Sequence, residues 1–167
     1  MSGPEIITLG CRLNIAESEA IRQQMGNAPD LVVVNSCAVT GEAVRQTRQA
    51  IRRAHRARPD ARIVVTGCAA QTDPAMFAAM PEVALVAGNL EKQDLRSYLR
   101  ADEADTAPPV RVADIMTVAR QTPQLLSAFA ERVRAFIVVQ NGCDHRCTFC
   151  IIPYGRGLSR SVPVDDV

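Results

Sequence analysis

Three short runs of apolar residues, each followed closely by a cysteine, constrain the fold of this chain most strongly. They read EIITLGC at 5–11, DLVVVNSC at 30–37 and ARIVVTGC at 61–68. Their apolar residues are continuous rather than alternating, which is typical of strands buried on both faces of a parallel sheet. The sequence therefore predicts three neighbouring parallel strands, each with a cysteine just beyond its carboxyl end.

Helix-capping residues mark the stretches between and after these runs. We expect three helices, at 14–25 with Asn14 as the N-cap, at 40–58 with Thr40 at its start, and at 73–80 with Asp73 and Pro74 at its start. A further strand is expected at 83–89 and a further helix at 91–100. Strands that alternate with helices are typical of an α/β fold, here a small Rossmann-like parallel sheet with flanking helices.

The composition of the chain divides it into three parts. Residues 1–100 form the predicted α/β domain. Residues 101–128 are acidic and then rich in proline, so we interpret them as a linker, with a short strand candidate in VRVADI. A new apolar run, RVRAFIVVQNGC at 132–143, lies in the third part, 129–167, and predicts another strand that leads into a cysteine.

The six cysteines form two sets of three. The first, which we call the strand-end set, follows the three apolar runs and consists of Cys11, Cys37 and Cys68. The carboxyl ends of parallel strands meet at one edge of a sheet, where open α/β proteins bind their ligands. We therefore expect the three thiols to converge there. For each cysteine taken alone, the alternative is a small buried residue of the core.

The second set, which we call the loop set, lies in NGCDHRCTFCIIPYGRG with the spacing C-x₃-C-x₂-C and consists of Cys143, Cys147 and Cys150. A four-iron cluster normally takes four thiolates. Three thiolates leave one iron with an open position, as in catalytic metal sites, and an open position can bind a small molecule. A zinc site that uses His145 or one strand-end cysteine is the alternative.

Charge and hydropathy narrow the class of protein. The formal net charge is +1, so overall charge gives no argument for nucleic-acid or membrane binding. No apolar run approaches the ~18–20 residues that span a bilayer, and the first residues, MSGPEIITLGC, lack the pattern of a signal peptide. We therefore expect a cytoplasmic protein without membrane contact, in which thiols stay reduced.

The loop CDHRCTFCIIPYGRG resembles the cluster loop of radical S-adenosylmethionine (SAM) enzymes, and Phe149 fills the aromatic position of their pattern C-x₃-C-x-aromatic-C. The segments TLGCRLN, VVNSCAVTGEAVRQTRQAIRRA and VVTGCAAQ resemble the amino-terminal domain of the methylthiotransferases. The resemblance implies that residues 1–100 are that domain and that residues 129–167 are the first β unit of a radical SAM (β/α) barrel.

The resemblance also implies two [4Fe–4S] clusters with different tasks. The loop set would bind a cluster whose open iron chelates SAM, with Phe149 and Tyr154 in the SAM pocket; Tyr154 and Arg156 are also candidates for supporting the loop. One-electron reduction, by a donor such as flavodoxin or ferredoxin, cleaves SAM to a 5′-deoxyadenosyl radical that abstracts hydrogen from the target carbon. The strand-end set would bind the auxiliary cluster that carries the sulfur, and C–H becomes C–S–CH₃.

The branch that the sequence resembles most acts on N6-threonylcarbamoyladenosine at position 37 of tRNA and gives its 2-methylthio derivative. Alternatives are the isopentenyladenosine branch, the ribosomal-protein branch and a non-catalytic iron–sulfur protein. The helix at 40–58 is predicted to be amphipathic, with Val44, Ile51 and Ala54 on its apolar face. Its basic face is a candidate for contact with tRNA phosphates or a solvated surface, and consists of Arg45, Arg48, Arg52 and Arg56.

Two features depart from the family pattern. The family usually has a strand between the first helix and the second cysteine-bearing strand, but only residues 26–30 separate them here. The chain also ends at Val167, whereas barrels of this class need roughly 200 residues or more. We therefore expect the chain to be incomplete and inactive alone, and residues 129–167 to be poorly ordered or exposed without their partner strands.

Overall fold

The computed structural model of the chain describes residues 3–95, 110–120 and 136–167. Its main element is a five-stranded parallel sheet in the order β1-β2-β3-β4-β5, with the strands β1 (Glu5–Thr8), β2 (Leu31–Ser36), β3 (Arg62–Gly67), β4 (Leu85–Ala87) and β5 (Val110–Arg111). The predicted Rossmann-like α/β sheet is confirmed, and the four strands predicted up to residue 89 all lie in it. Part of the predicted linker joins the sheet as well, because β5 pairs with β4 as an edge strand.

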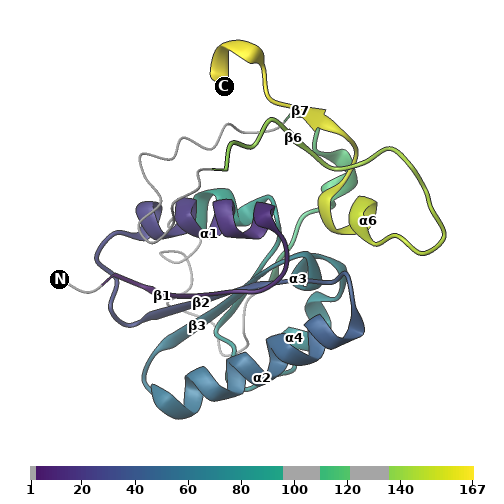
Figure 1. Cartoon of the computed structure of the whole chain (residues 1–167). Helices are drawn as coiled ribbons and strands as arrows, with labels where there is room; N and C mark the ends of the chain where they lie inside the picture. The colour runs from purple at the N-terminus through teal and green to yellow at the C-terminus, as the bar shows by residue number, and fades with distance from the viewer. Residues whose placement is uncertain (1–2, 96–109, 121–135) are drawn as a thin grey trace.

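Helices flank the sheet on both faces (Figure 1), and they are α1 (Arg12–Met25), α2 (Gly41–Ala57), α3 (Cys68–Thr72) and α4 (Pro74–Ala78), with 3₁₀ turns η1 (Glu91–Asp94) and η2 (Ile115–Thr117). Two predicted caps are confirmed. Thr40 accepts a hydrogen bond from the backbone N–H of Ala43 at 3.1 Å, and Asp73 accepts one from Met76 at 3.1 Å. The predicted helix at 91–100 is a 3₁₀ turn over Glu91–Asp94, and residues 96–100 lie outside the described residues.

The N-cap of helix α1 is Cys11, three residues before the predicted N-cap Asn14. The prediction for Asn14 was wrong because its side chain is used elsewhere. The amide of Asn14 is buried and donates to the carbonyl oxygens of Leu9 at 2.6 Å and Ser36 at 3.0 Å. One side chain therefore satisfies backbone acceptors at the ends of both β1 and β2, as buried polar groups require.

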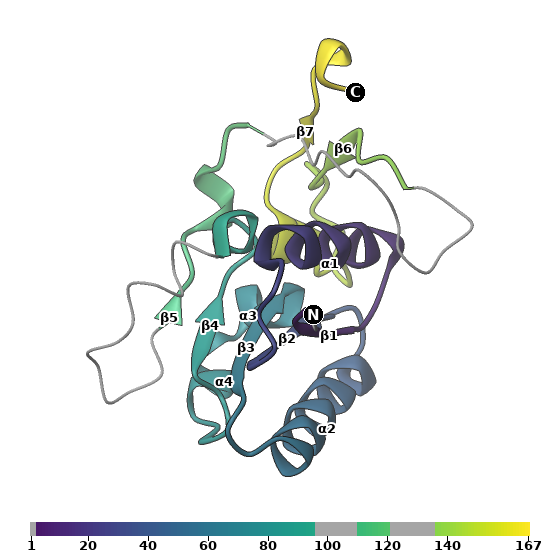
Figure 2. The ribbon, with the colours of Figure 1, turned by 90° about the vertical axis from the view of Figure 1, so that its left-hand side faces the viewer.

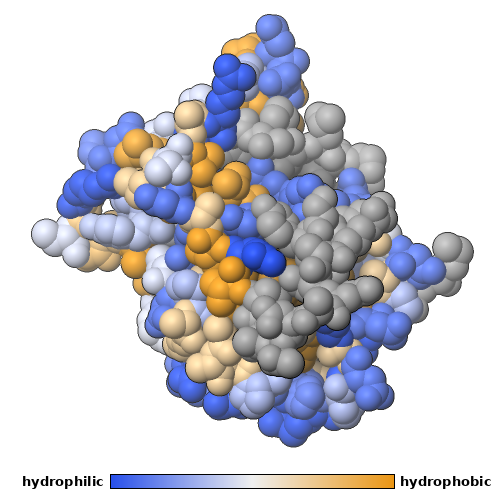
Figure 3. Space-filling view, turned by 180° about the vertical axis from the view of Figure 1, so that it is seen from behind, coloured by the Kyte–Doolittle hydropathy of each residue, from blue (hydrophilic) through white to orange (hydrophobic). Residues whose placement is uncertain are grey.

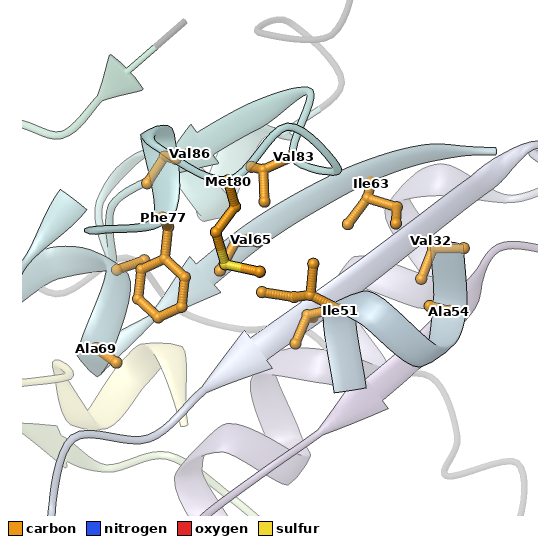
Figure 4. Close-up of a cluster of buried hydrophobic side chains, with 12 residues drawn as sticks. Val32, Ile51, Ala54, Ile63, Val65, Ala69, Phe77, Met80, Val83 and Val86 are labelled. Carbon is orange, nitrogen blue, oxygen red and sulfur yellow. The ribbon is translucent and has the colours of Figure 1, made fainter. Parts of the chain in front are cut away.

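The core consists of two layers of mainly aliphatic side chains, one on each face of the sheet. One layer lies between the sheet and α2, α3 and α4, and includes Val32, Ile51, Ile63, Val65 and Phe77 (Figure 4). The other lies between the sheet, α1 and the end of η1, and includes Ile21, Val33, Val64, Leu85 and Leu95. Successive residues of one strand point into opposite layers, which explains why the apolar runs are continuous.

The connection from β1 to β2 is a left-handed crossover. Figure 2 shows β1, β2 and β3 succeeding one another in one direction across the sheet, while α1 and α2 cover opposite faces. The two crossovers therefore have opposite hands, and the one through α2 has the right-handed form found in ~98% of cases. The crossover with the unusual hand has a short loop, since residues 26–30 join α1 directly to β2, and β1 is an edge strand of the described sheet.

The segment from residue 136 onward forms no parallel unit in its described part. Strand β6 (Gln140–Asn141) pairs antiparallel with β7 (Arg160–Ser161), and α6 (Ile152–Arg156) packs against α3. The predicted strand is thus short, and residues 132–135 lie outside the described residues. The expected exposure holds for most of the cysteine loop, but α6 differs from it because Gly155 and Arg156 are buried against the α/β domain.

Apolar residues are exposed in a few places on the surface of the described residues. Seen from behind, apolar residues gather in a band beside the residues drawn in grey (Figure 3). Most of the large apolar side chains that are exposed belong to residues 136–167, among them Ile137, Val139, Phe149, Ile152 and Tyr154. Among the described helices, none combines the length and the apolar character that crossing a membrane requires.

Candidate functional site

One strand-end cysteine follows each of the first three strands of the sheet, at the carboxyl edge of the sheet. Cys11 is the N-cap of α1, Cys37 directly follows β2, and Cys68 is the first residue of α3. Cys37 is buried, whereas Cys11 is exposed. Burial raises the pKa of Cys37; a backbone hydrogen bond from Val39 opposes this rise, and the charges of Cys68 and Cys11 add to it.

Two glycines allow the turns that carry these cysteines to pass close to the end of β2. Gly10 has a φ of 98°, and a Cβ there would lie 2.7 Å from Cys37 Cβ and 2.8 Å from Cys37 Sγ. Gly67 has a φ of 95°, and a Cβ there would lie 2.5 Å from the backbone nitrogen of Ser36. Both positions therefore require a residue without a side chain.

We expect Gly10→Ala to lower the free energy of unfolding by about 1–3 kcal/mol, because residues with a side chain rarely adopt this backbone conformation and the new methyl group would overlap Cys37. Urea-induced unfolding of the metal-free chain measures the change. Gly41→Ala is the matched control, since a Cβ there meets nothing within 4 Å, and it should be neutral or slightly stabilising. Equal losses in both variants would contradict the assigned role of Gly10.

The loop set lies in a largely exposed turn between β6 and α6. Cys147 is exposed, and Cys143 and Cys150 are half-buried. The backbone N–H of Cys143 donates to the carbonyl oxygen of Gly157 at 3.0 Å, which closes the base of the loop. All six cysteines of the chain are free thiols.

The two aromatic residues that were expected near SAM have different surroundings. Phe149 is 91% exposed on the loop. Tyr154 lines an open cleft of about 610 Å³ between α3, η2 and α6, together with Gln71, Ile115 and Ile151 among others. The cleft thus includes Tyr154, and Phe149 is not among its lining residues.

Arg156, on α6, connects the segment of the loop set to the strand-end set. Its side chain is buried, and its Nε donates to Cys68 Sγ at 3.0 Å. Its two Nη atoms donate to Glu17 and Asn14 on α1. Gly155 permits this approach, because a Cβ there would already lie 3.1 Å from Cys68 Cβ. The contact with Cys68 was not predicted from the sequence.

Glu17 and Lys92 complete a buried charge cluster with Arg156. Lys92 Nζ lies 2.6 Å from Glu17 Oε2, and the side chains of Lys92 and Glu17 are 2% and 3% exposed. Burial alone would raise the pKa of Glu17, but Arg156 and Lys92 together lower it below its usual value. Burial and Arg156 lower the pKa of Lys92 to about 8, against the opposing effects of Glu17 and Cys68. The sequence hint at this cluster is slight: Asn14 and Glu17 are three residues apart, and so share a helix face.

The chemistry of the strand-end set fits an iron–sulfur cluster. An arginine can only donate hydrogen bonds, so Cys68 Sγ is the acceptor of the bond from Arg156 Nε. Within residues 3–95, 110–120 and 136–167, no three His, Cys, Asp or Glu side chains form a group that could hold a metal ion. Thiolates are ligands of zinc as well as of iron–sulfur clusters.

The basic face of α2 lies on the surface as predicted, and Arg45, Arg48, Arg52 and Arg56 are exposed. Part of its charge is compensated. Arg45 forms an ion pair with Glu42 at 2.6 Å, and Arg52 lies 3.9 Å from Glu82. Of the predicted apolar face, Ile51 and Ala54 are buried and Val44 is partly buried. The net positive potential of this face is therefore lower than the sequence alone suggests.

The amino-terminal part of the chain matches a family of known sequences. A family model described as "Uncharacterized protein family UPF0004" matches residues 4–88. These residues contain the whole strand-end set and all strands up to β4. They include Glu17 of the buried charge cluster but neither Lys92 nor Arg156.

Several curated proteins are similar over nearly the whole chain. The threonylcarbamoyladenosine tRNA methylthiotransferase MtaB of Rickettsia prowazekii (strain Madrid E) is 49% identical over 165 residues, which cover 98% of this chain and 38% of the relative. MtaB of Bacillus subtilis (strain 168) is 39% identical over 96% of this chain and 38% of the relative. The tRNA-2-methylthio-N(6)-dimethylallyladenosine synthase of Bifidobacterium longum (strain DJO10A) is 34% identical over 97% of this chain and 37% of the relative. The chain spans less than half the length of these relatives.

Proposed function

The chain belongs to the family described as Uncharacterized protein family UPF0004, and on this premise we propose that it works as part of a tRNA methylthiotransferase whose substrate is threonylcarbamoyladenosine at position 37. The relative from Rickettsia prowazekii that is named for this activity is 49% identical, whereas the dimethylallyladenosine synthase is 34% identical. That difference supports threonylcarbamoyladenosine over isopentenyladenosine as the substrate.

One observation carries the proposal, namely the contact between the segments of the two cysteine sets. Arg156 extends from the segment of the loop set and donates to Cys68 of the strand-end set. Two reactive centres that act on one nucleoside have to lie close together, because reacting groups that a protein holds near one another react faster. A protein that only carries electrons would not need an iron with an open coordination position in either cluster.

We assign one [4Fe–4S] cluster to each set, the SAM-binding one to Cys143, Cys147 and Cys150 and the auxiliary one to Cys11, Cys37 and Cys68. When bound, the clusters and SAM supply the radical and the sulfur for converting C–H to C–S–CH₃. Tyr154 borders the cleft beside α3 and is the residue we assign to the SAM side. The apolar side chains exposed on residues 136–167 fit the proposed start of a radical SAM barrel, whose further strands would cover them.

The proposed partners are tRNA and a one-electron donor such as flavodoxin or ferredoxin. The basic face of α2 is the candidate tRNA contact in this chain. Its exposed arginines would bind phosphates, and the affinity would then fall as salt concentration rises.

Iron and sulfide analysis after anaerobic reconstitution tests the cluster assignment. We expect about eight irons in the unmodified chain and about four in each of Cys68→Ala and Cys147→Ala, because each change removes a ligand of one four-iron cluster. His145→Ala is the matched control on the exposed loop and should keep about eight. Zinc without iron or sulfide, or an equal loss in His145→Ala, would contradict the assignment.

A further inference from the structure

The charge cluster of Glu17, Lys92 and Arg156 has an excess of one positive charge. The exposed fractions of these side chains are 3%, 2% and 4%, so all three are removed from water. Two cations face a single carboxylate. Buried charge without a partner is strongly unfavourable, so the arrangement calls for a further anion nearby.

The strand-end set supplies that anion. Arg156 Nε lies 3.0 Å from Cys68 Sγ and donates a hydrogen bond to it. Three thiolates and a [4Fe–4S] core carry a net negative charge. The excess positive charge therefore faces the position where the auxiliary cluster is proposed.

Arg156 differs in this respect from the other buried arginine of its segment. Arg160 is 7% exposed, but it donates to the backbone carbonyl oxygens of Leu158 at 3.0 Å and Arg156 at 2.8 Å. Its hydrogen bonds stabilise the turn after α6. Arg156 instead directs all three of its donor nitrogens into the α/β domain.

We propose that Arg156 is a positioning residue of the strand-end site, which fixes the Cys68 sulfur and, together with Lys92, raises the reduction potential of the cluster bound there. This inference rests on the proposed function, since it assumes a cluster on the strand-end set. It adds that α6, which belongs to the segment of the loop set, completes the strand-end site. The auxiliary cluster would then have its native reduction potential only while α6 packs against the α/β domain.

The physical basis is electrostatic. Reduction adds one electron to an already anionic cluster, and a buried cation stabilises the more negative form. Hydrogen bonds to the sulfurs and net charge are among the factors that set cluster potentials. Low-dielectric surroundings strengthen such charge–charge interactions relative to water. Removal of the positive charge should therefore make the cluster harder to reduce.

The test uses the full chain with Cys143, Cys147 and Cys150 replaced by serine, so that any cluster lies on the strand-end set. In this background, Arg156→Gln should lower the equilibrium constant for reduction about tenfold, a shift of about 59 mV to more negative potential for a one-electron couple. Potentiometric titration followed by electron paramagnetic resonance measures it. Arg156→Lys keeps the charge and should recover most of the potential.

Two further variants separate this role from simple support of the fold. Arg160→Gln removes a buried arginine of the same segment that does not contact Cys68, and it should shift the potential far less than Arg156→Gln. Lys92→Met removes the second cation without touching α6, and it should shift the potential in the same direction as Arg156→Gln. If Arg156→Gln binds no iron, the potential measured in Lys92→Met tests the inference in its place.

The outcomes distinguish the inference from the proposed function. A cluster that keeps its potential in both Arg156→Gln and Lys92→Met would overturn the inference and leave the cluster assignment intact. Equal shifts in Arg156→Gln and Arg160→Gln would also overturn it. An unmodified strand-end set that binds no iron would overturn both.

Discussion

Replacing Glu17 with glutamine should lower the free energy of unfolding of the metal-free chain by about 3–5 kcal/mol, because it leaves two buried cations without their carboxylate. Lys92 Nζ lies 2.6 Å from Glu17 Oε2, and Arg156 donates to both carboxylate oxygens. The glutamine is close in size and keeps hydrogen-bonding capacity, so the loss reports mainly the charge. Urea-induced unfolding at neutral pH measures it.

Glu42→Gln is the matched control for this prediction. Glu42 also forms an ion pair, with Arg45 at 2.6 Å, but both side chains are more than half exposed. Exposed ion pairs contribute about 0–1 kcal/mol, so this variant should remain within that range. A loss of the same size in both variants would show that the contribution of Glu17 to the free energy of unfolding does not depend on its burial.

The free energy of unfolding at acid pH provides an independent check on the role of Glu17. Burial by itself would raise the pKa of Glu17, but Arg156 and Lys92 lower this pKa below its usual value. The stability that ionised Glu17 contributes is therefore fully present above the unfolded pKa and is lost as pH falls through the lower folded pKa. The difference between the unmodified chain and Glu17→Gln should shrink across that window. A difference that stays constant there would contradict the pKa shift.

Deletion of the gene that encodes this chain should abolish 2-methylthio-threonylcarbamoyladenosine in cellular tRNA, with the unmethylthiolated nucleoside accumulating in its place. This is the second large effect that we expect, because we assume that the cell has no other enzyme that makes the proposed product. Mass spectrometry of tRNA nucleosides measures both species. The intact gene should restore the modification, and the gene with Cys68→Ala should not.

Other nucleosides from the same samples serve as the control. The 2-methylthio derivative of isopentenyladenosine should be unchanged. If that derivative disappears instead, the chain belongs to the isopentenyladenosine branch. If both persist and a methylthio group is lost from a ribosomal protein, the tRNA proposal is wrong.

Local sequence signals predicted much of this fold. Thr40 and Asp73 cap their helices through contacts three residues away, so the information lies within one turn of chain. The continuous apolar runs identified strands covered on both faces, and the strand-end positions of Cys37 and Cys68 followed from parallel pairing. These features depend on neighbours in sequence or on the general geometry of parallel sheets.

Contacts between distant residues were not predictable in the same way. Arg156 and Asn14 are 142 positions apart, and no sequence pattern around either residue indicates that they are in contact. Asn14 looks like a helix cap because asparagine commonly is one, but its amide joins two strand ends instead. Lys92 is an ordinary charged residue in sequence and becomes a buried cation only because Glu17 and Arg156 surround it.

The place of the loop between α1 and β2 has a practical consequence. The loop at 26–30 lies at the amino end of β2, the opposite end of the strand from Cys37. A peptide tag or a fluorophore grafted into this loop would therefore extend away from the sulfur-bearing rim. Labels placed there would lie at the opposite edge of the sheet from the strand-end set.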